Sequence, residues 1–371
     1  MKTTKLIHAT YPEIDGIALI QRFADHLVKL RTDKLAAVSV GDDEQSRDLG
    51  SDDIGGMPLE QSSGVELTWQ DTRRIEQRVN KIIQRMRAAS GLAHLKDEEI
   101  IRLRPLFTSV KLLTLEGEHW VDELIATLHA EMPWMAPATI EVWHALQRGA
   151  ATGGVIRIPP LILNGPPGIG KSVWARRLSE LLHIPRCEID ASLGGVGFSI
   201  AGTERGWSSA QAGRPLETIL QHQVGNPLMV VDEICKAQSG TSTNGANHSF
   251  ANSLLSLLEP ATSAAWECPY YRTKIDMSHI SWVLTANDAS RIPAPLLSRC
   301  VVINLPKISC AQLQRFAVRK ADELGLTKAS ADAIEQVIGN EMQKANANTS
   351  LRDVVRILRR AEVLESRPML H

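Results

Sequence analysis

A short apolar strand followed at once by a glycine-rich turn is the feature that most limits what this chain can fold into. Residues 161–164 read Leu-Ile-Leu-Asn, and residues 165–172 match the phosphate-binding pattern GxxxxGK[ST]. Glycines let backbone N–H groups curl around phosphate oxygens, and a helix that opens near Lys171 presents its positive dipole end. The sequence therefore predicts a nucleoside triphosphate site formed, in chain order, by Gly165, Pro166, Pro167, Gly168, Ile169, Gly170, Lys171, Ser172 and Val173.

Strand and helix patterns alternate after this loop. Apolar runs at 186–190, 228–232, 280–286 and 300–305 follow the run at 161–164, with helical stretches between them. Such alternation is typical of a parallel sheet flanked by helices, in which ligands bind at the carboxyl edge of the strands. The expected fold is α/β, with a doubly wound core, a C-terminal helical domain and an N-terminal helical extension.

Changes in composition divide the chain into five predicted segments. Residues 1–40 form a helical segment, residues 41–66 an acidic flexible linker with little to bury, and residues 67–150 a helical region that leads into the core. Residues 151–306 form the nucleotide-binding core. Residues 307–371 contain only amphipathic helices and form a C-terminal helical lid.

Composition restricts the class of partner and the location. The formal net charge of −1 gives no general electrostatic reason to bind nucleic acid or an anionic membrane. The five cysteines show no CxxC spacing, which is typical of reduced residues in a cytosolic protein. The N-terminal residues lack the apolar stretch of a signal peptide, and no run has the length of a membrane span. We expect a cytoplasmic protein without membrane contact.

Later strand ends supply the groups that phosphoryl transfer requires. The apolar run at 227–231 ends in Asp232 and Glu233, where Asp232 would hold Mg²⁺ with Ser172 and Glu233 would polarise the attacking water. Asn287 follows the run at 280–286 and can hold that water, although an asparagine at this point also starts many turns. Arg299 stands just before the last strand, where an arginine is ordinarily a surface charge.

These motifs together resemble a known family. The segments GPPGIGKS, LMVVDEI, WVLTAND and IPAPLLSRC occur in the order and approximate spacing of an AAA+ ATPase module, and the closest likeness is to the ATPase module of Lon proteases over residues 130–366. The resemblance implies ATP and Mg²⁺ as cofactors. It also makes Asn287 the sensor 1 residue and Arg299 an arginine finger that acts on the nucleotide of the neighbouring subunit, which implies a ring, expected to be a hexamer.

The resemblance extends to the last helix and to the base of the nucleotide. Ser350 and Asp353 fit a capping box, and Arg352 in the first turn matches the sensor 2 arginine, with an exposed helix arginine as the alternative. Trp134 and Met135 fall where this family begins its adenine pocket. The predicted catalytic residues are Lys171, Glu233, Asn287, Arg299 and Arg352.

The chain departs from the Lon pattern in two places. Lon proteases continue into a Ser/Lys peptidase domain, whereas this sequence stops at His371, so we expect a motor without its own protease. In the region of the first pore loop, Gln211 and Ala212 stand where Lon carries an aromatic and an aliphatic residue that grip a polypeptide. Phe198 or Trp207 is the alternative grip, although an aromatic residue here can also be a local packing anchor.

Two other features leave alternatives open. Residues 236–248 are too polar to pack, which predicts a loop near the pore, at a subunit interface or on the plain surface. The aromatic group Trp266, Tyr270 and Tyr271 favours burial against the sheet over substrate contact.

The expected function is Mg-dependent ATP hydrolysis by a Lon-like ring motor that remodels an unidentified protein substrate or complex. A basic helix at 68–89, with six Lys or Arg residues between Arg73 and Arg87, is the one direct hint of a nucleic-acid motor or loader. A solvated helix face explains the same residues. The third alternative is a nucleotide-controlled scaffold with little turnover.

Overall fold

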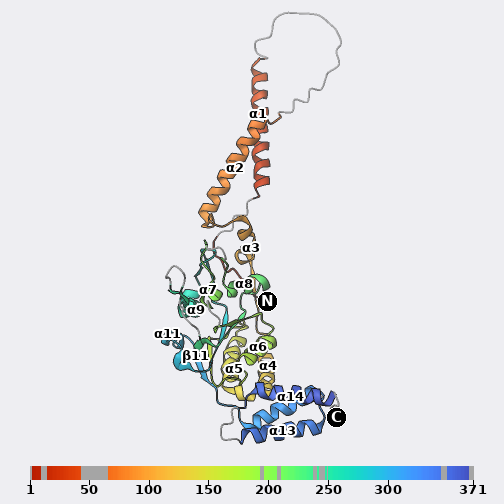
Figure 1. Ribbon diagram of the computed structural model, residues 1–371. Helices are drawn as coiled ribbons and strands as arrows, with labels where there is room; N and C mark the ends of the chain where they lie inside the picture. The colour runs from red at the N-terminus through yellow and green to blue at the C-terminus, as the bar shows by residue number, and fades with distance from the viewer. Residues whose placement is uncertain are drawn as a thin grey trace, which may run out of the picture. The chain divides into compact units, whose positions relative to one another are not determined.

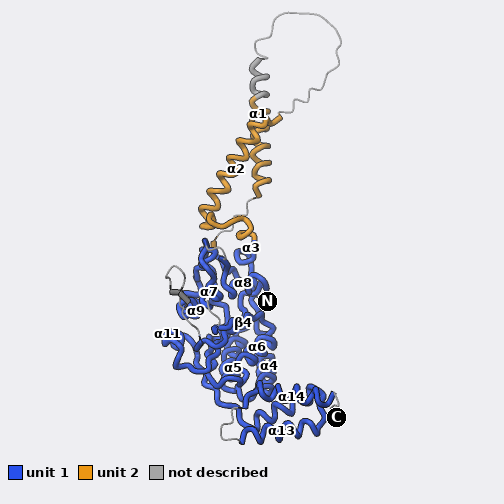
Figure 2. The backbone as a smooth tube through the Cα atoms, viewed as in Figure 1, with its two compact units in different colours: residues 1–8, 102–371 blue, residues 9–101 orange. Residues whose placement is uncertain are grey.

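The computed structural model describes residues 2–9, 15–42, 66–192, 196–206, 210–236, 240–241, 247–248, 250–343 and 349–366. The chain divides into two compact units, residues 1–8 with 102–371 (unit 1) and residues 9–101 (unit 2), which Figure 2 colours blue and orange. The predicted helical region at 67–150 is divided between these two units. The division of the chain into five segments remains a prediction from the sequence. The predicted linker at 41–66 lies almost wholly outside the described residues.

Unit 2 is built on two long helices, α1 (Gly16–Asp42) and α2 (Trp69–Ser90), followed by the first turn of α3 (Asp97–Thr108) (Figure 1). Thr68 caps α2, because its hydroxyl accepts from the N–H of Asp71 while the Asp71 carboxylate accepts from the N–H of Thr68. The same carboxylate accepts two hydrogen bonds from Arg31 of α1, at 2.7 and 2.8 Å. The N-terminal extension is therefore a pair of helices joined by a bidentate ion pair.

Unit 1 contains a parallel five-stranded sheet in the order β11-β3-β10-β5-β4. Its strands are β3 (Leu161–Asn164), β4 (Arg186–Asp190), β5 (Leu228–Asp232), β10 (Ser281–Ala286) and β11 (Val301–Asn304). These are the predicted strands, displaced by at most one residue at an end, and the predicted α/β class is confirmed. Strands β3, β5 and β10 are buried along nearly their whole length because layers cover both faces of the sheet.

Helices flank this sheet (Figure 1), and several of them share one core with it. Side chains of α4, α5 and α6 pack in one cluster with Leu163, Val230 and Val283, which lie on the same face of the strands. Pro137 lies in the first turn of α5, where a proline is tolerated because that turn leaves its N–H groups without helical partners. The flanking elements are α4 (Glu118–Glu131), η1 (Pro133–Met135), α5 (Ala136–Ala150), α6 (Lys171–Leu181), α7 (Val196–Ala201), α8 (Arg214–His222), η2 (Ile234–Lys236), α9 (Phe250–Leu258), α10 (Pro260–Ser263), η3 (Ala289–Arg291) and α11 (Ala294–Leu297).

The C-terminal region is helical, as predicted, and consists of α12 (Cys310–Glu323), α13 (Lys328–Met342) and α14 (Leu351–Ser366). Ser309 and Gln312 form a capping box at the start of α12. The buried side chains Leu313, Ile334 and Leu358 belong to the same cluster as the sheet, so this lid packs on the core.

Three two-stranded pairs complete the described part of unit 1. They are β1 (Lys2–Thr4) with β2 (Val110–Leu112), β6 (Gly240–Thr241) with β7 (Asn247–His248), and β8 (Trp266–Cys268) with β9 (Thr273–Ile275). Beside the first pair, the N–H groups of Leu6 and Ile7 both donate to the carbonyl of Leu106 at 3.0 Å. Trp266 and Tyr271 are buried and Tyr270 is half-buried, so two of the three aromatic side chains are buried as predicted.

Much of the polar segment at 236–248 lies outside the described residues, and its two described ends pair as β6 and β7. Among the helices of the described residues, none combines the length and the apolar character that crossing a bilayer needs.

Candidate active site

The glycine-rich loop connects β3 to α6 and has the backbone that the pattern predicts. Gly168 and Gly170 have φ values of 77° and 90°, a conformation that side-chain-bearing residues rarely adopt. A Cβ on Gly165 would lie 2.8 Å from the carbonyl oxygen of Leu305, and one on Gly168 would lie 2.7 Å from the Cβ of Ser350. The loop therefore requires glycine for its conformation and for close approach to β11 and to the lid.

Lys171 begins α6 and its side chain folds back over the loop. Its ammonium donates to the carbonyl oxygens of Gly165 (2.6 Å) and Pro166 (2.9 Å) and to Oδ1 of Asn287 (3.0 Å). Burial lowers the pKa of Lys171, whereas the carboxylates of Asp232 and Glu233 act to raise it. The structure thus joins two predicted catalytic residues, Lys171 and Asn287, which are far apart in the sequence.

Asp232 lies at the carboxyl end of β5 and is held by two hydroxyl groups. The hydroxyl of Ser172 lies 2.8 and 2.9 Å from the two carboxylate oxygens of Asp232. The hydroxyl of Thr285 on β10 also donates to Asp232 and accepts from the N–H of Glu233 at 3.0 Å. The start of α6 and the ends of two strands therefore bring hard oxygen atoms to one place, which is the donor type that Mg²⁺ prefers.

Glu233 follows Asp232 in an unusual conformation. Its φ of 57° lies in the left-handed region, which is uncommon for a residue with a side chain, and strained conformations of this kind cluster at functional sites. Its carboxylate accepts a hydrogen bond from the ammonium of Lys236 at 2.7 Å. The predicted water-polarising group is thus present at the strand end and is engaged by a neighbouring cation.

One cavity of about 760 Å³ is lined by Lys171, Ser172, Asp232, Glu233, Thr285 and Asn287. The lid contributes Arg352 to the wall, and the N–H of Leu351 donates to the carbonyl of Gly168 at 3.2 Å. Trp134 lines the cavity as well, and its indole N–H donates to the carbonyl of Ile169 at 2.9 Å. Met135 is fully buried and does not line the cavity.

Arg299 does not line this cavity. Its guanidinium donates to a carboxylate oxygen of Glu259 at 2.9 Å and to the carbonyl of Pro295 at 3.1 Å. Val301, two residues later, pairs with Leu161 at the amino end of β3, so Arg299 lies near the edge of the sheet opposite to the phosphate loop. The site within one chain is therefore assembled without Arg299.

Hydrogen bonds join residues on either side of the predicted pore loop. Thr203 and Gln211 exchange hydrogen bonds between the N–H of Thr203 and the carbonyl of Gln211 (2.9 Å), and between the N–H of Gln211 and the hydroxyl of Thr203 (2.8 Å). Ala212 is buried and forms a bridge with Gly202. Phe198 is half-buried on α7, and Trp207 lies outside the described residues.

Sequence reasoning missed several residues that line the cavity. Thr285 has no signal in the sequence, because a threonine in an apolar strand is ordinary. Arg356 and Arg359 follow Arg352 by four and seven positions on α14, and this spacing places all three on one helix face. Phe316 of α12 stacks edge-on against Trp134, with ring centroids 5.9 Å apart, and forms an aromatic wall.

A glycine loop between a central strand and a helix, with a lysine and a serine at the start of that helix and an aspartate at the end of another strand of the sheet, defines the P-loop class of nucleotide-binding proteins. Residues 161–307 match the family described as "ATPase family associated with various cellular activities (AAA)". This part of the chain is an AAA domain, and the resemblance stated from the motifs is confirmed.

The chain is similar to Lon proteases over this module. It is 29% identical over 211 residues to Lon protease of Chlamydia trachomatis, covering 54% of this chain and 25% of that protein. It is 33% identical over 218 residues to the peroxisomal Lon protease homolog 2 of Spinacia oleracea, covering 56% and 24%. The chain thus spans about a quarter of the length of these curated relatives.

A solved structure supports the fold alone. A cryo-EM reconstruction of Hsp104 in its closed state, with ATPγS and FITC casein, superposes with a TM-score of 0.51 at 13% identity. It covers 76% of this chain and 50% of the Hsp104 chain.

Proposed function

We propose that this protein is a Mg-dependent ATPase that hydrolyses ATP at a subunit interface of a ring. The observation that carries the proposal is the convergence of Lys171, Ser172, Asp232, Glu233 and Asn287 on one cavity, from the loop and two strand ends. Phosphoryl transfer needs mainly positioning and charge stabilisation from the protein, and these residue types supply both.

The residues present fit ATP and Mg²⁺. Ser172 and Asp232 offer adjacent oxygen ligands, and two protein ligands suit Mg²⁺, which keeps several waters and binds phosphate oxygens as well. When bound, Mg²⁺ neutralises the charge that develops on the phosphates. The aromatic wall of Trp134 and Phe316 offers an apolar surface for a base, and the choice of adenine follows from the AAA family.

Each predicted catalytic residue has a role that its place in the cavity permits. Lys171 exchanges its bonds to the loop carbonyls for phosphate oxygens, and Asn287, released from Lys171, holds the attacking water. Glu233 accepts a proton from that water once its carboxylate leaves Lys236. Arg352 reaches the cavity from the lid and adds positive charge near the terminal phosphate.

Arg299 acts in trans in this proposal. Its place outside the cavity of its own chain leaves it available to the nucleotide of a neighbouring subunit, as the family resemblance implies. A head-to-tail contact of this kind closes into a ring when the rotation per subunit allows it, and a hexamer is the expected size.

We propose a protein, rather than a nucleic acid, as the substrate that the motor remodels in the cytoplasm. Three of the six cations of the basic helix α2 contact other residues of unit 2. Arg73 and Arg78 lie over the rings of Trp69 and Phe23, and Arg87 pairs with Asp97 at 2.6 Å. These contacts leave fewer cations free for phosphates than the sequence suggests.

The test is ATP hydrolysis across a protein concentration series, with oligomeric size measured at each point, for the wild type and for Glu233→Gln and Arg299→Ala. Turnover that rises with assembly and is lost in both variants is the expected result. Nucleotide binding without turnover in the wild type contradicts the motor and favours the scaffold alternative. Stimulation by DNA, abolished by salt, would favour the nucleic-acid alternative.

A further inference from the structure

Arg319 of α12 joins the lid to the end of a core helix. Its guanidinium donates to the carbonyl oxygens of Ala130 at 2.9 Å and of Glu131 at 2.7 Å. These two carbonyls belong to the last turn of α4, where no helical N–H follows to serve as their donor. The dipole of α4 also favours a cation at this end. Arg319 therefore caps α4 from a different part of the fold.

The end of α4 is also connected to the phosphate loop. The carboxylate of Glu131 accepts hydrogen bonds from the guanidinium of Arg177 on α6, at 2.7, 2.8 and 3.1 Å. Helix α6 begins at Lys171, directly after Gly170 of the loop. Glu131 thus contacts the lid through its backbone and the phosphate-loop helix through its side chain, so these three elements meet at one residue.

Arg319 contacts both sides of the aromatic wall of the nucleotide cavity. On the core side, the chain continues from Glu131 to Met132 and Trp134, which line the cavity. On the lid side, the ring of Phe316 lines the cavity, and its centroid lies 5.8 Å from the guanidinium carbon of Arg319. Arg319 itself does not line the cavity. Its contacts therefore act on the spacing of the wall and not on a ligand.

The two rings of this wall can hold a base only through apolar contact and stacking. The indole N–H of Trp134 already donates to the carbonyl of Ile169 at 2.9 Å, and the side chain of Phe316 has no polar atom. Dispersion contacts lose much of their energy when surfaces separate by less than an ångström. The affinity for a base therefore depends on how accurately the lid ring is placed relative to the core ring.

We propose that Arg319 is a positioning residue for the base of the nucleotide, because it fixes the lid ring Phe316 relative to Trp134 by its bonds to the end of α4. The proposal rests on the nucleotide site proposed above. It gives Arg319 no contact with the nucleotide itself.

Two probes separate the base from the phosphates. AMP-PNP, a hydrolysis-resistant analogue of ATP, carries the base, the ribose and the phosphate chain, whereas inorganic tripolyphosphate carries the phosphate chain alone. Calorimetry with Mg²⁺ measures the Kd of each probe for the full chain, in the wild type, Arg319→Met, Phe316→Leu and the double variant. Methionine keeps an apolar stem and removes the donors, and leucine keeps an apolar side chain and removes the ring.

We expect Arg319→Met and Phe316→Leu each to weaken AMP-PNP binding about fivefold, the lower end of the range of about five- to 150-fold for loss of a base–aromatic contact. The Kd of tripolyphosphate stays unchanged, which a general loss of folding would not allow. Because Arg319 acts through Phe316, the double variant also binds AMP-PNP about fivefold more weakly, whereas independent effects would multiply to about 25-fold.

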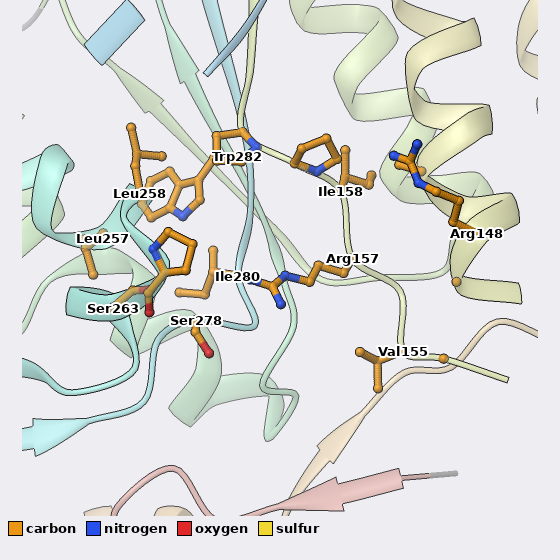
Figure 3. Close-up of a pocket in the computed structure, with 16 residues that line it drawn as sticks. Arg148, Val155, Arg157, Ile158, Leu257, Leu258, Ser263, Ser278, Ile280 and Trp282 are labelled. Atoms are coloured by element: carbon orange, nitrogen blue, oxygen red, sulfur yellow. The ribbon is translucent and has the colours of Figure 1, made fainter. Parts of the chain in front are cut away.

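Two other arginine variants are the controls. Arg315→Met changes an exposed arginine one turn before Arg319 on the same helix. Arg157→Met changes an arginine of a separate cavity of about 510 Å³, near the starts of β3 and β10, which shares no lining residue with the nucleotide cavity (Figure 3). Both variants should bind the two probes with the Kd of the wild type.

Equal weakening of both probes in Arg319→Met, or effects that multiply in the double variant, would overturn the proposal. Equal affinity of the wild type for the two probes would also overturn it, because the wall then contributes nothing. If the wild type binds neither probe, the proposed nucleotide site itself is wrong. If thermal unfolding shows that Arg319→Met does not fold, Arg319→Lys, which has a single donor group in place of the planar fork, replaces it in the same cycle.

Discussion

Thr285→Val tests whether the hydroxyl that joins Asp232 to Glu233 organises the active site. Valine has the same branched shape and suits a central strand, so the change isolates the hydroxyl. Thr285 is 1% exposed, and the variant leaves the N–H of Glu233 without its partner and removes one of the two hydroxyl donors to Asp232. Both consequences fall on residues proposed to activate water and to hold Mg²⁺.

The magnitude follows from the two lost hydrogen bonds. A neutral bond such as that of the Glu233 N–H contributes about 1 kcal/mol net, and a bond to an ionised carboxylate about 1.5–3 kcal/mol. The sum, about 2.5–4 kcal/mol, is the expected order of the loss of stability, and Asp232 keeps its contact with Ser172 at 2.8 Å. If only the weaker bond supports the transition state, kcat falls about fivefold, and more if both do.

The assay measures kcat, KM for ATP and thermal unfolding for Thr285→Val beside Thr218→Val. Thr218 is also buried, but its hydroxyl donates only to the carbonyl of Arg214 within α8. We expect a lower kcat in Thr285→Val alone. Unchanged kcat in Thr285→Val, or an equal decrease in both variants, would contradict this role of the Thr285 hydroxyl.

Three further predictions follow from ion pairs. Arg299→Ala lowers assembly-dependent turnover about 10³-fold or more but leaves nucleotide affinity unchanged, because Arg299 lies outside the cavity. The control is Glu259→Gln, which frees Arg299 from its ion pair and changes turnover by no more than about fivefold. Lost affinity in Arg299→Ala would contradict this. Lys236→Met frees Glu233 from a partly exposed ion pair and raises basal kcat up to about fivefold. Lys307→Met, at an exposed position, is the control. A decrease of kcat in Lys236→Met would show that Lys236 assists catalysis. Arg31 and then Thr68 hold the pKa of Asp71 below its ordinary 3.8, so this pair stabilises the α1–α2 contact fully above about pH 4 and loses effect as pH falls. Hydrogen exchange of α2, corrected for intrinsic rates, should therefore quicken below pH 4 in the wild type and show no such step in Asp71→Asn.

The sheet and the phosphate loop were predictable because their signals are local. An apolar run of five residues ending in Asp232, or a glycine pattern ending in Lys171, requires no knowledge of distant contacts. The positions of Asn287 and Glu233 at strand ends followed from the rule that parallel strands share their carboxyl edge.

Other parts of the site depend on tertiary contacts and carry no local signal. Thr285 matters only because register places it beside Asp232, and Phe316 only because α12 packs near Trp134. The pairing of β1 with β2 joins residues more than a hundred positions apart, which no periodicity within a segment can reveal. The ion pair of Arg299 with Glu259, 40 positions apart, belongs to the same class of contact.

That pairing has a consequence for how the chain is assembled. Since Leu6 and Ile7 share the carbonyl of Leu106, the backbone leaves the AAA-containing unit and returns to it at neighbouring points. Residues 9–101 are therefore an insertion in unit 1, and the two points where the chain leaves and re-enters unit 1 are neighbours. Its length or sequence can change while the registers of β1 and β2 stay fixed, so the helices can diverge without disturbing the sheet that carries the phosphate loop.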